Sequence, residues 1–210
     1  MTGPARLQSL VDAVRYCVRR EIPGDFAECG VWRGGSVLAM ILTLQELGAE
    51  RDIHLFDTFE GMTAPTEHDV SALDPPALET WEQARQENGR AWNELFDPAL
   101  FNEDGVRETL LSTGYPAERL HLVRGTVEET LPASAPATMA LLRLDTDWYE
   151  STKHELEHLY PRLAEGGVLI IDDYGHWDGA RRAVDEYFDA HGRPLLLNRI
   201  DYTGRIAVKH

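Results

Sequence analysis

Four aspartates are the residues of this chain whose type and spacing are best suited to chemistry. Asp145 and Asp147 follow the apolar run MALLRL. Asp172 and Asp173 follow a second run, GGVLII. Each run is typical of a buried parallel strand, and such strands present their carboxyl ends at one edge of a sheet, where open α/β sheets bind ligands. Carboxylates gathered there would repel one another, and oxygen ligands suit a hard cation such as Mg²⁺, so the pattern predicts a metal-assisted enzyme.

Helix and turn capping is the alternative interpretation of some of these aspartates. Asp147 could be the N-cap of a helix that begins near Glu150, and Asp173 could cap a turn. His176 follows the second pair closely and is a candidate base in place of Asp147, although a surface turn is the simpler interpretation of this histidine.

Two further histidines have the spacing of metal ligands on a helix. His154 and His158 are four residues apart, so they share one helical face. Glu155 and Glu157 are interleaved with them, and this favours a solvated face over a metal site.

An alternating α/β array is predicted to position these side chains. A helix over 4–20 comes first, and a strand over 26–32, a helix from Ser36 to Gly48 and a strand over 52–59 then form a right-handed βαβ unit. The array continues with these elements: helix 103–113, strands 119–127 and 138–147, helix 150–164, strand 166–174 and helix 178–190. Segments 194–201 and 205–210 are joined by Tyr202-Thr203-Gly204, a hairpin pattern. A mostly parallel sheet closed by an antiparallel hairpin is therefore expected.

Residues 60–102 interrupt the array. Prolines and aspartates break regular structure there, while tryptophans, phenylalanines and a leucine supply apolar anchors. A long insertion of this kind is usually functional, and its aromatic residues favour packing over disorder. We predict a lid within a single domain spanning 1–210.

The turn after the first predicted strand, ECGVWRGGS, predicts a nucleoside site. Its glycines let the backbone approach a ligand at a helix N-terminus. Glu28 can pair with the cationic amino group of S-adenosylmethionine, whereas it would repel the pyrophosphate of NAD. The glycine spacing also departs from G-x-G-x-x-G. Asp57, at the end of the next strand, stands where a carboxylate can accept hydrogen bonds from ribose hydroxyls.

Composition excludes several classes of partner. The chain has 210 residues, of which 43 % are hydrophobic and 27 % charged, as in soluble globular proteins. Its 20 basic and 36 acidic residues give a net charge of −16, which opposes binding to nucleic acids and anionic membranes. No apolar run reaches membrane-spanning length and no signal peptide is recognisable, so a cytoplasmic protein is expected. Cys17 and Cys29 are expected to be buried and inert.

Several segments together resemble the macrocin O-methyltransferase family of S-adenosylmethionine-dependent enzymes. They are FAECGVWRGGS, LFDTFEGM, GTVEETLP, LLRLDTDWYESTKHELEHLYPRLAEGGVLIIDDYG and RIDYTGRIAV, which cover most of the chain from Phe26 onwards. The resemblance implies the Rossmann-like, three-layer fold of class I methyltransferases with a seven-stranded sheet. It also implies Mg²⁺-dependent methylation of a hydroxyl on a small natural product, commonly on a deoxysugar, by a homodimer or higher homo-oligomer.

The same resemblance implies roles for individual residues. The metal ligands would be Asp145, Asp172 and Asp173, and the general base would be Asp147. The cofactor-binding residues would be Glu28, Gly30, Ser36, Asp57, Gly125 and Thr126. The chain departs from the family pattern at Thr146, where glycine is usual, and at Trp148, where an aliphatic residue is common. Both changes could reshape the acceptor pocket.

Two other functions remain open at this point. A nicotinamide-dependent oxidoreductase on a related sheet is disfavoured by Glu28 and by the glycine spacing. A non-catalytic binding protein is disfavoured by the presence of all four aspartates. Mg²⁺ and Mn²⁺ both accept oxygen ligands, so the pattern does not choose between them.

Overall fold

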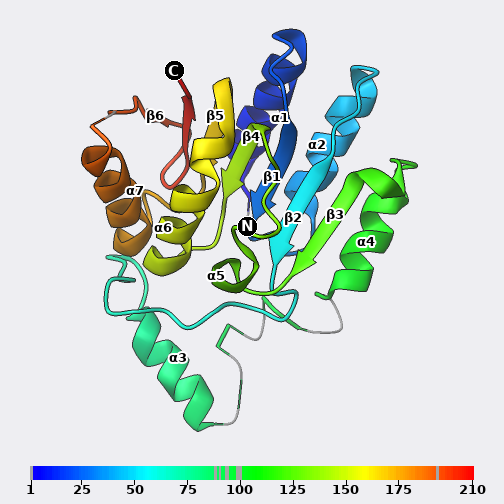
Figure 1. The fold of residues 1–210 in the computed structure, drawn as a ribbon. Coiled ribbons are helices and arrows are strands. Elements are labelled where there is room, and N and C mark those ends of the chain that lie inside the picture. The colour runs from blue at the N-terminus through cyan, green and yellow to red at the C-terminus, as the bar shows by residue number, and fades with distance from the viewer. Residues whose placement is uncertain (1, 88, 90, 93–94, 98–100, 193) are drawn as a thin grey trace.

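A mixed β-sheet organises the computed structural model, which describes residues 2–87, 89, 91–92, 95–97, 101–192 and 194–210. The strand order is β3-β2-β1-β4-β5-β7-β6 in a seven-stranded sheet. Neighbouring strands from β3 to β5 are parallel, whereas β7 is antiparallel to both β5 and β6 (Figure 1). The predicted mostly parallel sheet with a C-terminal antiparallel hairpin is therefore confirmed.

The strands are β1 Asp25–Cys29, β2 Ile53–Asp57, β3 Leu120–Arg124, β4 Met139–Leu144, β5 Leu163–Ile171, β6 Asn198–Arg199 and β7 Arg205–Val208. The α-helices are α1 Pro4–Arg19, α2 Gly35–Glu46, α3 Ala77–Gln86, α4 Glu103–Leu111, α5 Val127–Thr130, α6 Tyr149–His158 and α7 Asp178–Ala190. Short 3₁₀ helices span Ala117–Arg119 and Tyr160–Arg162.

Helices cover both faces of the sheet, which gives the three layers visible in Figure 1. One apolar cluster joins α1, α2 and α4 to the sheet, and a second joins α5, α6 and α7 to the opposite face. Neighbouring residues of β4 alternate between them, since Leu141 belongs to the first cluster and Leu142 to the second. Both faces of β4 are buried, which explains why its sequence is almost wholly apolar.

The register of the strands brings several predicted site residues to the same carboxyl edge of the sheet. Cys29 pairs with Phe56 on one side and with Leu144 on the other, and Leu144 pairs with Ile171. The residues that follow or end these strands therefore lie at the same carboxyl edge; they are Gly30, Asp57, Asp145 and Asp172.

Some element boundaries differ from those predicted. Strand β3 ends at Arg124 because Gly125 has a φ of +137°, and Val127 then begins α5, which was not predicted. Helix α6 ends at His158, close before Pro161, and the chain tightens into a 3₁₀ turn before β5. Strand β6 is only Asn198–Arg199.

The segment predicted to be a lid carries α3, which lies beyond the carboxyl edge of the sheet in Figure 1. Two of its polar groups tie it to the core: the Thr63 carbonyl accepts a 3.0 Å hydrogen bond from Nε1 of Trp148, and Asp69 is buried. Residues 88, 90, 93–94 and 98–100 of this segment are outside the described part. A lid function stays a prediction.

Two predictions from composition can be compared with the structure. Cys17 and Cys29 are free and buried, and burial raises the pKa of Cys17 to about 12. Among the described helices, none has the length and apolar character needed to cross a membrane.

Candidate active site

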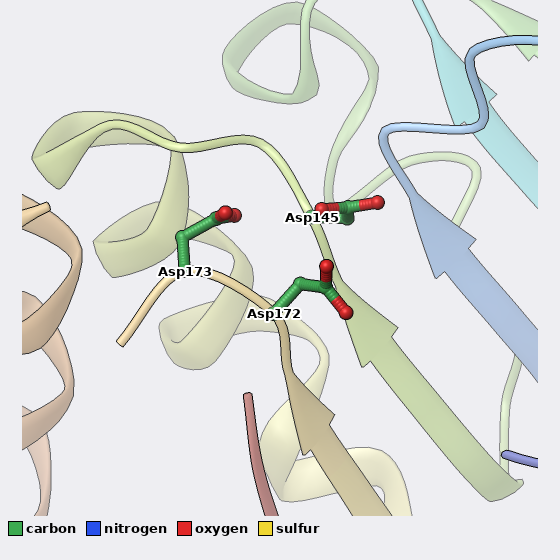
Figure 2. A group of neighbouring side chains, drawn as sticks. All are labelled: Asp145, Asp172 and Asp173. Carbon is green, nitrogen blue, oxygen red and sulfur yellow. The ribbon is translucent and has the colours of Figure 1, made fainter. Parts of the chain in front are cut away.

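Three carboxyl groups meet at the ends of β4 and β5. One oxygen each from Asp145, Asp172 and Asp173 lies within 4.8 Å of the others (Figure 2). The sheet holds two of them through their backbones, because Asp145 N donates to the Cys29 carbonyl and Asp172 N to the Leu144 carbonyl, both at 2.9 Å. The arrangement predicted from the two apolar runs is present, and its donor atoms are those of a hard-cation site.

Asp147 lies beside this group but is held by different contacts. Its backbone adopts a φ of +67°, and its N–H donates to Oδ2 of Asp173 at 3.2 Å. Its Oδ1 accepts a 2.9 Å hydrogen bond from Nε1 of Trp177. The N-cap of α6 is Trp148, without a side-chain cap, so the interpretation of Asp147 as a helix cap is wrong.

Arg143 is a buried counterion that the sequence reasoning missed. Its Nη1 contacts Glu28 and lies 2.8 Å from Oδ2 of Asp145, while its Nη2 lies 2.8 Å from Oδ1 of Asp172. The arginine side chain is only 2 % exposed. An arginine inside the apolar run MALLRL is the signal that could have revealed it, since a strand buried on both faces rarely carries an unpaired charge.

Carboxyl groups outnumber guanidinium groups among the described residues of the site. Arg6 of α1 pairs with Asp172 and, through Nε at 3.0 Å, with Asp201. Two guanidinium groups thus face a larger set of carboxyls: Glu28, Asp145, Asp147, Asp172 and Asp173. Burial raises the pKa of Asp173 well above its usual value, and the charges of Asp147, Asp145 and Asp172 raise it further.

Glu28 and Gly30 lie at the end of β1 beside the cluster, and contact of either residue with the cofactor stays a prediction. Glu28 is 1 % exposed, and burial raises its pKa to about 7 against the opposing effect of Arg143. Its Oε2 is buried and has no hydrogen-bond partner among the described residues. Gly30 has a φ of +80°, and a Cβ added to it would stand 1.9 Å from the Asp145 carbonyl oxygen, so only glycine fits.

Asp57 organises the glycine turn. Its Oδ2 accepts hydrogen bonds from the backbone N–H groups of Val31 and Trp32 at 2.7 and 2.9 Å, and its Oδ1 accepts one from Phe59 N at 2.7 Å. Burial raises the pKa of Asp57. These bonds hold the turn against the end of β2, and contact of Asp57 with a ribose stays a prediction.

A single cavity of about 670 Å³ joins the cluster to the glycine turn. Its lining includes every residue predicted for the cofactor, the metal and the base: Glu28, Gly30, Ser36, Asp57, Gly125, Thr126, Asp145, Asp147, Asp172 and Asp173. Thr2 and Arg6 of the N-terminal segment also line it, and Trp92, Trp148 and Trp177 form an aromatic wall near Asp147.

Asp69 anchors the loop that precedes α3, a contact that no local pattern indicated. Its Oδ1 accepts a 2.7 Å hydrogen bond from Tyr149 N, at the first residue of α6. Its Oδ2 accepts bonds from the backbone N–H and the hydroxyl of Thr66 at 2.6 and 2.9 Å. The segment predicted to be a lid therefore supplies the carboxylate at the N-terminus of α6, a role that the sequence pattern offered for Asp147.

His176 lines the same cavity. Its Nε2 lies 2.6 Å from Oδ2 of Asp74, a residue of the segment predicted to be a lid. His176, just before α7, therefore links that helix to the segment predicted to be a lid. A role of His176 as the base stays untested.

Glu155 corrects one expectation about α6. It was assigned to a solvated face, but it is completely buried while Glu157 is exposed. Its Oε1 accepts a 3.0 Å hydrogen bond from the hydroxyl of Thr146, and its Oε2 has no partner among the described residues. Burial raises the pKa of Glu155 well above its usual value.

We predict that Glu155→Gln makes the protein less sensitive to pH. Because the folded-state pKa of Glu155 is raised, the native state keeps a proton that the unfolded state releases, and stability falls as pH rises above about 5. Relative to the parent, the free energy of unfolding of the variant should therefore rise by at least about 1 kcal/mol as the pH is raised from 5 to 7. Urea unfolding at both pH values measures this, with Glu157→Gln as control. Parallel pH profiles for parent and Glu155→Gln would contradict it.

Comparison with known proteins gives a consistent assignment. The macrocin-O-methyltransferase (TylF) family matches residues 1–208. The chain is 35 % identical over 205 residues to the 8-demethyl-8-(2,3-dimethoxy-alpha-L-rhamnosyl)-tetracenomycin-C 4'-O-methyltransferase of Streptomyces olivaceus, covering 97 % of this chain and 73 % of that protein. It is 32 % identical over 206 residues to the mycinamicin III 3''-O-methyltransferase of Micromonospora griseorubida, covering 97 % and 76 %.

Solved structures agree with the sequence relatives. The O-methyltransferase NovP has a TM-score of 0.81 and 29 % identity, covering 99 % of this chain and 80 % of NovP. The calicheamicin methyltransferase CalS11 shares the fold, with a TM-score of 0.71 at 24 % identity over 98 % of this chain and 80 % of that one.

The fold and the cavity at its carboxyl edge thus define a class I methyltransferase. More narrowly, the chain belongs to the macrocin O-methyltransferase (TylF) family and is an O-methyltransferase. Membership implies S-adenosylmethionine as the methyl donor, and it favours this activity over the nicotinamide-dependent alternative.

Proposed function

We propose that this enzyme methylates a sugar hydroxyl of a glycosylated natural product, with a divalent cation held by Asp145, Asp172 and Asp173 and with Asp147 as general base. The observation that carries the proposal is the shared cavity: the carboxyl cluster, Asp147 and the glycine turn all line it. The first relative named above methylates an acceptor that carries a rhamnosyl group, which supports a sugar-bearing acceptor. A homodimer and a cytoplasmic location remain part of this proposal.

The residues around the cluster fit a cation. All three candidate ligands are carboxylates within 4.8 Å of one another, and among the described residues the carboxyls of the site outnumber the two nearby arginines. Burial raises the pKa of Asp173, and the neighbouring carboxylates raise that pKa further. Mg²⁺ bound there would lower the pKa of an acceptor hydroxyl and orient it.

The remaining steps belong to side chains of this chain. Glu28, whose buried Oε2 has no described partner, is suited to the ammonium group of S-adenosylmethionine. Gly30, which lines the cavity, lets the turn pack directly against the Asp145 carbonyl, because a side chain there would collide with it. Asp147 lies beside the cluster and would take the proton from the acceptor hydroxyl as the methyl group transfers. Alignment of acceptor oxygen, methyl carbon and sulfur is the main demand of such a displacement.

Calorimetric titration of S-adenosylmethionine into metal-free protein, repeated with Mg²⁺, tests the cofactor and the metal separately. We expect micromolar binding of the cofactor. Asp173→Asn should weaken Mg²⁺ binding by at least about 10-fold. Loss of a residue that only hydrogen-bonds to a metal ligand already lowers metal affinity by about that factor, and Asp173 is a candidate ligand itself. Asp189→Asn, on the exposed side of α7, makes the same chemical change away from the cavity and is the control.

Absence of cofactor binding in both conditions would refute the methyl-donor assignment, whereas unchanged Mg²⁺ affinity in Asp173→Asn would refute the metal site alone. Methyl transfer is then measured by mass spectrometry with the rhamnosyl-bearing acceptor and the mycinamicin III named for the relatives. Turnover that survives complete chelation would also contradict the metal proposal.

A further inference from the structure

Trp177 makes a direct contact with the residue proposed as the base. Its indole Nε1 donates a 2.9 Å hydrogen bond to Oδ1 of Asp147, across thirty positions of sequence. Trp177 is the N-cap residue of α7, whereas Asp147 belongs to the turn between β4 and α6. The contact therefore exists only because these two elements pack together.

The tryptophan ring is fixed by its surroundings. It is 7 % exposed and packs edge to face against Trp148 at a centroid distance of 5.0 Å. Ala180 belongs to the same buried cluster. Because the ring is confined by packing, the direction of its N–H bond is confined as well.

Asp147 is thus held at two points. Trp177 binds Oδ1, and the backbone N–H of Asp147 donates to Asp173 at 3.2 Å. No hydrogen bond to Oδ2 is present among the described residues. The contacts leave this second oxygen as the one able to face an acceptor hydroxyl in the cavity.

We propose that Trp177 is a positioning residue for methyl transfer: its indole N–H orients the Asp147 carboxylate so that Oδ2 receives the acceptor proton. The inference rests on the proposed function of Asp147 as base. A base oriented by a third group is a recurrent arrangement in enzymes that activate a hydroxyl, and loss of the orienting group chiefly affects the chemical step.

Trp177→Phe tests the proposal, since phenylalanine keeps an aromatic ring but has no N–H donor. With whichever of the two relatives' acceptors the parent methylates faster, kcat should fall by about 10- to 100-fold, the equivalent of one hydrogen bond to a charged group. KM for S-adenosylmethionine and for the acceptor should change by less than about 3-fold, because neither is bound by the lost N–H. Trp81→Phe is the matched control, because the Trp81 indole N–H has no partner among the described residues.

A double-mutant cycle separates this inference from the proposal it rests on. If Asp147 is the base and Trp177 acts through it, adding Trp177→Phe to Asp147→Asn should lower kcat no further. Unchanged turnover in Asp147→Asn would refute the base itself. Impaired Asp147→Asn together with normal kcat in Trp177→Phe, or equal losses on both backgrounds, would refute positioning alone.

A spectroscopic measurement covers the case in which Trp177→Phe folds poorly. In the parent protein, the indole proton of Trp177 should resonate downfield in a ¹H–¹⁵N spectrum because it bonds to a carboxylate. Asp147→Ala should move this signal upfield while the Trp81 signal stays in place. If the chemical shift of the Trp177 indole proton stays the same in Asp147→Ala, the proposed contact is refuted.

Discussion

Asp147→Asn is expected to lower kcat by about 10²- to 10⁴-fold, the usual contribution of a general base. Asparagine has the same shape, retains an oxygen to accept the Trp177 hydrogen bond, and tolerates the left-handed backbone seen at this position. It cannot accept the acceptor proton. The loss should therefore appear in kcat and leave cofactor affinity unchanged, measured by methyl transfer and by calorimetry on the same preparation.

Asp189→Asn provides the control for this change, because it removes one carboxylate from the exposed side of α7. Thermal unfolding of Asp147→Asn would show whether the fold is retained. Turnover within about 3-fold of the parent would be incompatible with Asp147 as base and would direct attention to His176, which lines the same cavity.

Arg143→Met is expected to reduce the free energy of unfolding by about 3–5 kcal/mol, the range for removing one partner of a buried ion pair. Methionine fills much of the arginine volume but leaves Glu28, Asp145 and Asp172 without their shared cation. Arg143 opposes the burial that raises the pKa of Glu28 and of Asp145, so its removal raises both pKa values further and protonation relieves the repulsion. The loss relative to the parent should therefore shrink as pH falls.

Urea unfolding at two pH values measures this effect. Arg15→Met, which removes a surface pair with Glu46, is the comparison and should change stability far less. A loss of under about 1 kcal/mol for Arg143→Met would mean that Arg143 is not the counterion of this cluster. Added Mg²⁺ should stabilise both proteins, and Arg143→Met more strongly, because the variant lacks the cation that pairs with two of the candidate ligands.

Local sequence pattern was sufficient to predict the sheet and the edge where the site lies. The apolar runs before Asp145 and Asp172 are long enough to be buried strands, and a strand that ends in aspartate delivers that side chain to the carboxyl edge. The glycine turn after β1 and the C-terminal hairpin follow from equally local signals. These features depend on the spacing of apolar residues along the chain and on the residues that interrupt that spacing.

Burial of individual side chains was less predictable because it depends on what each element packs against. Glu155 shows this most clearly: helical position and neighbouring charges assigned it to solvent, yet α6 turns it into the interior, where Thr146 donates to it. Burial of a carboxyl is decided by the packing of the whole helix between its neighbours, which a pattern of charges on one helix does not contain.

The sequence by itself determined the α/β fold, the resemblance to a methyltransferase family and the set of acidic residues at one edge. Only the tertiary structure decided how those residues are paired. Arg143 with Glu28, Asp69 with the start of α6, and Trp177 with Asp147 are each contacts between elements distant in the chain. Such pairs form where strand register and helix packing bring two side chains within hydrogen-bond distance, and neither quantity is encoded in the spacing of residues along one segment.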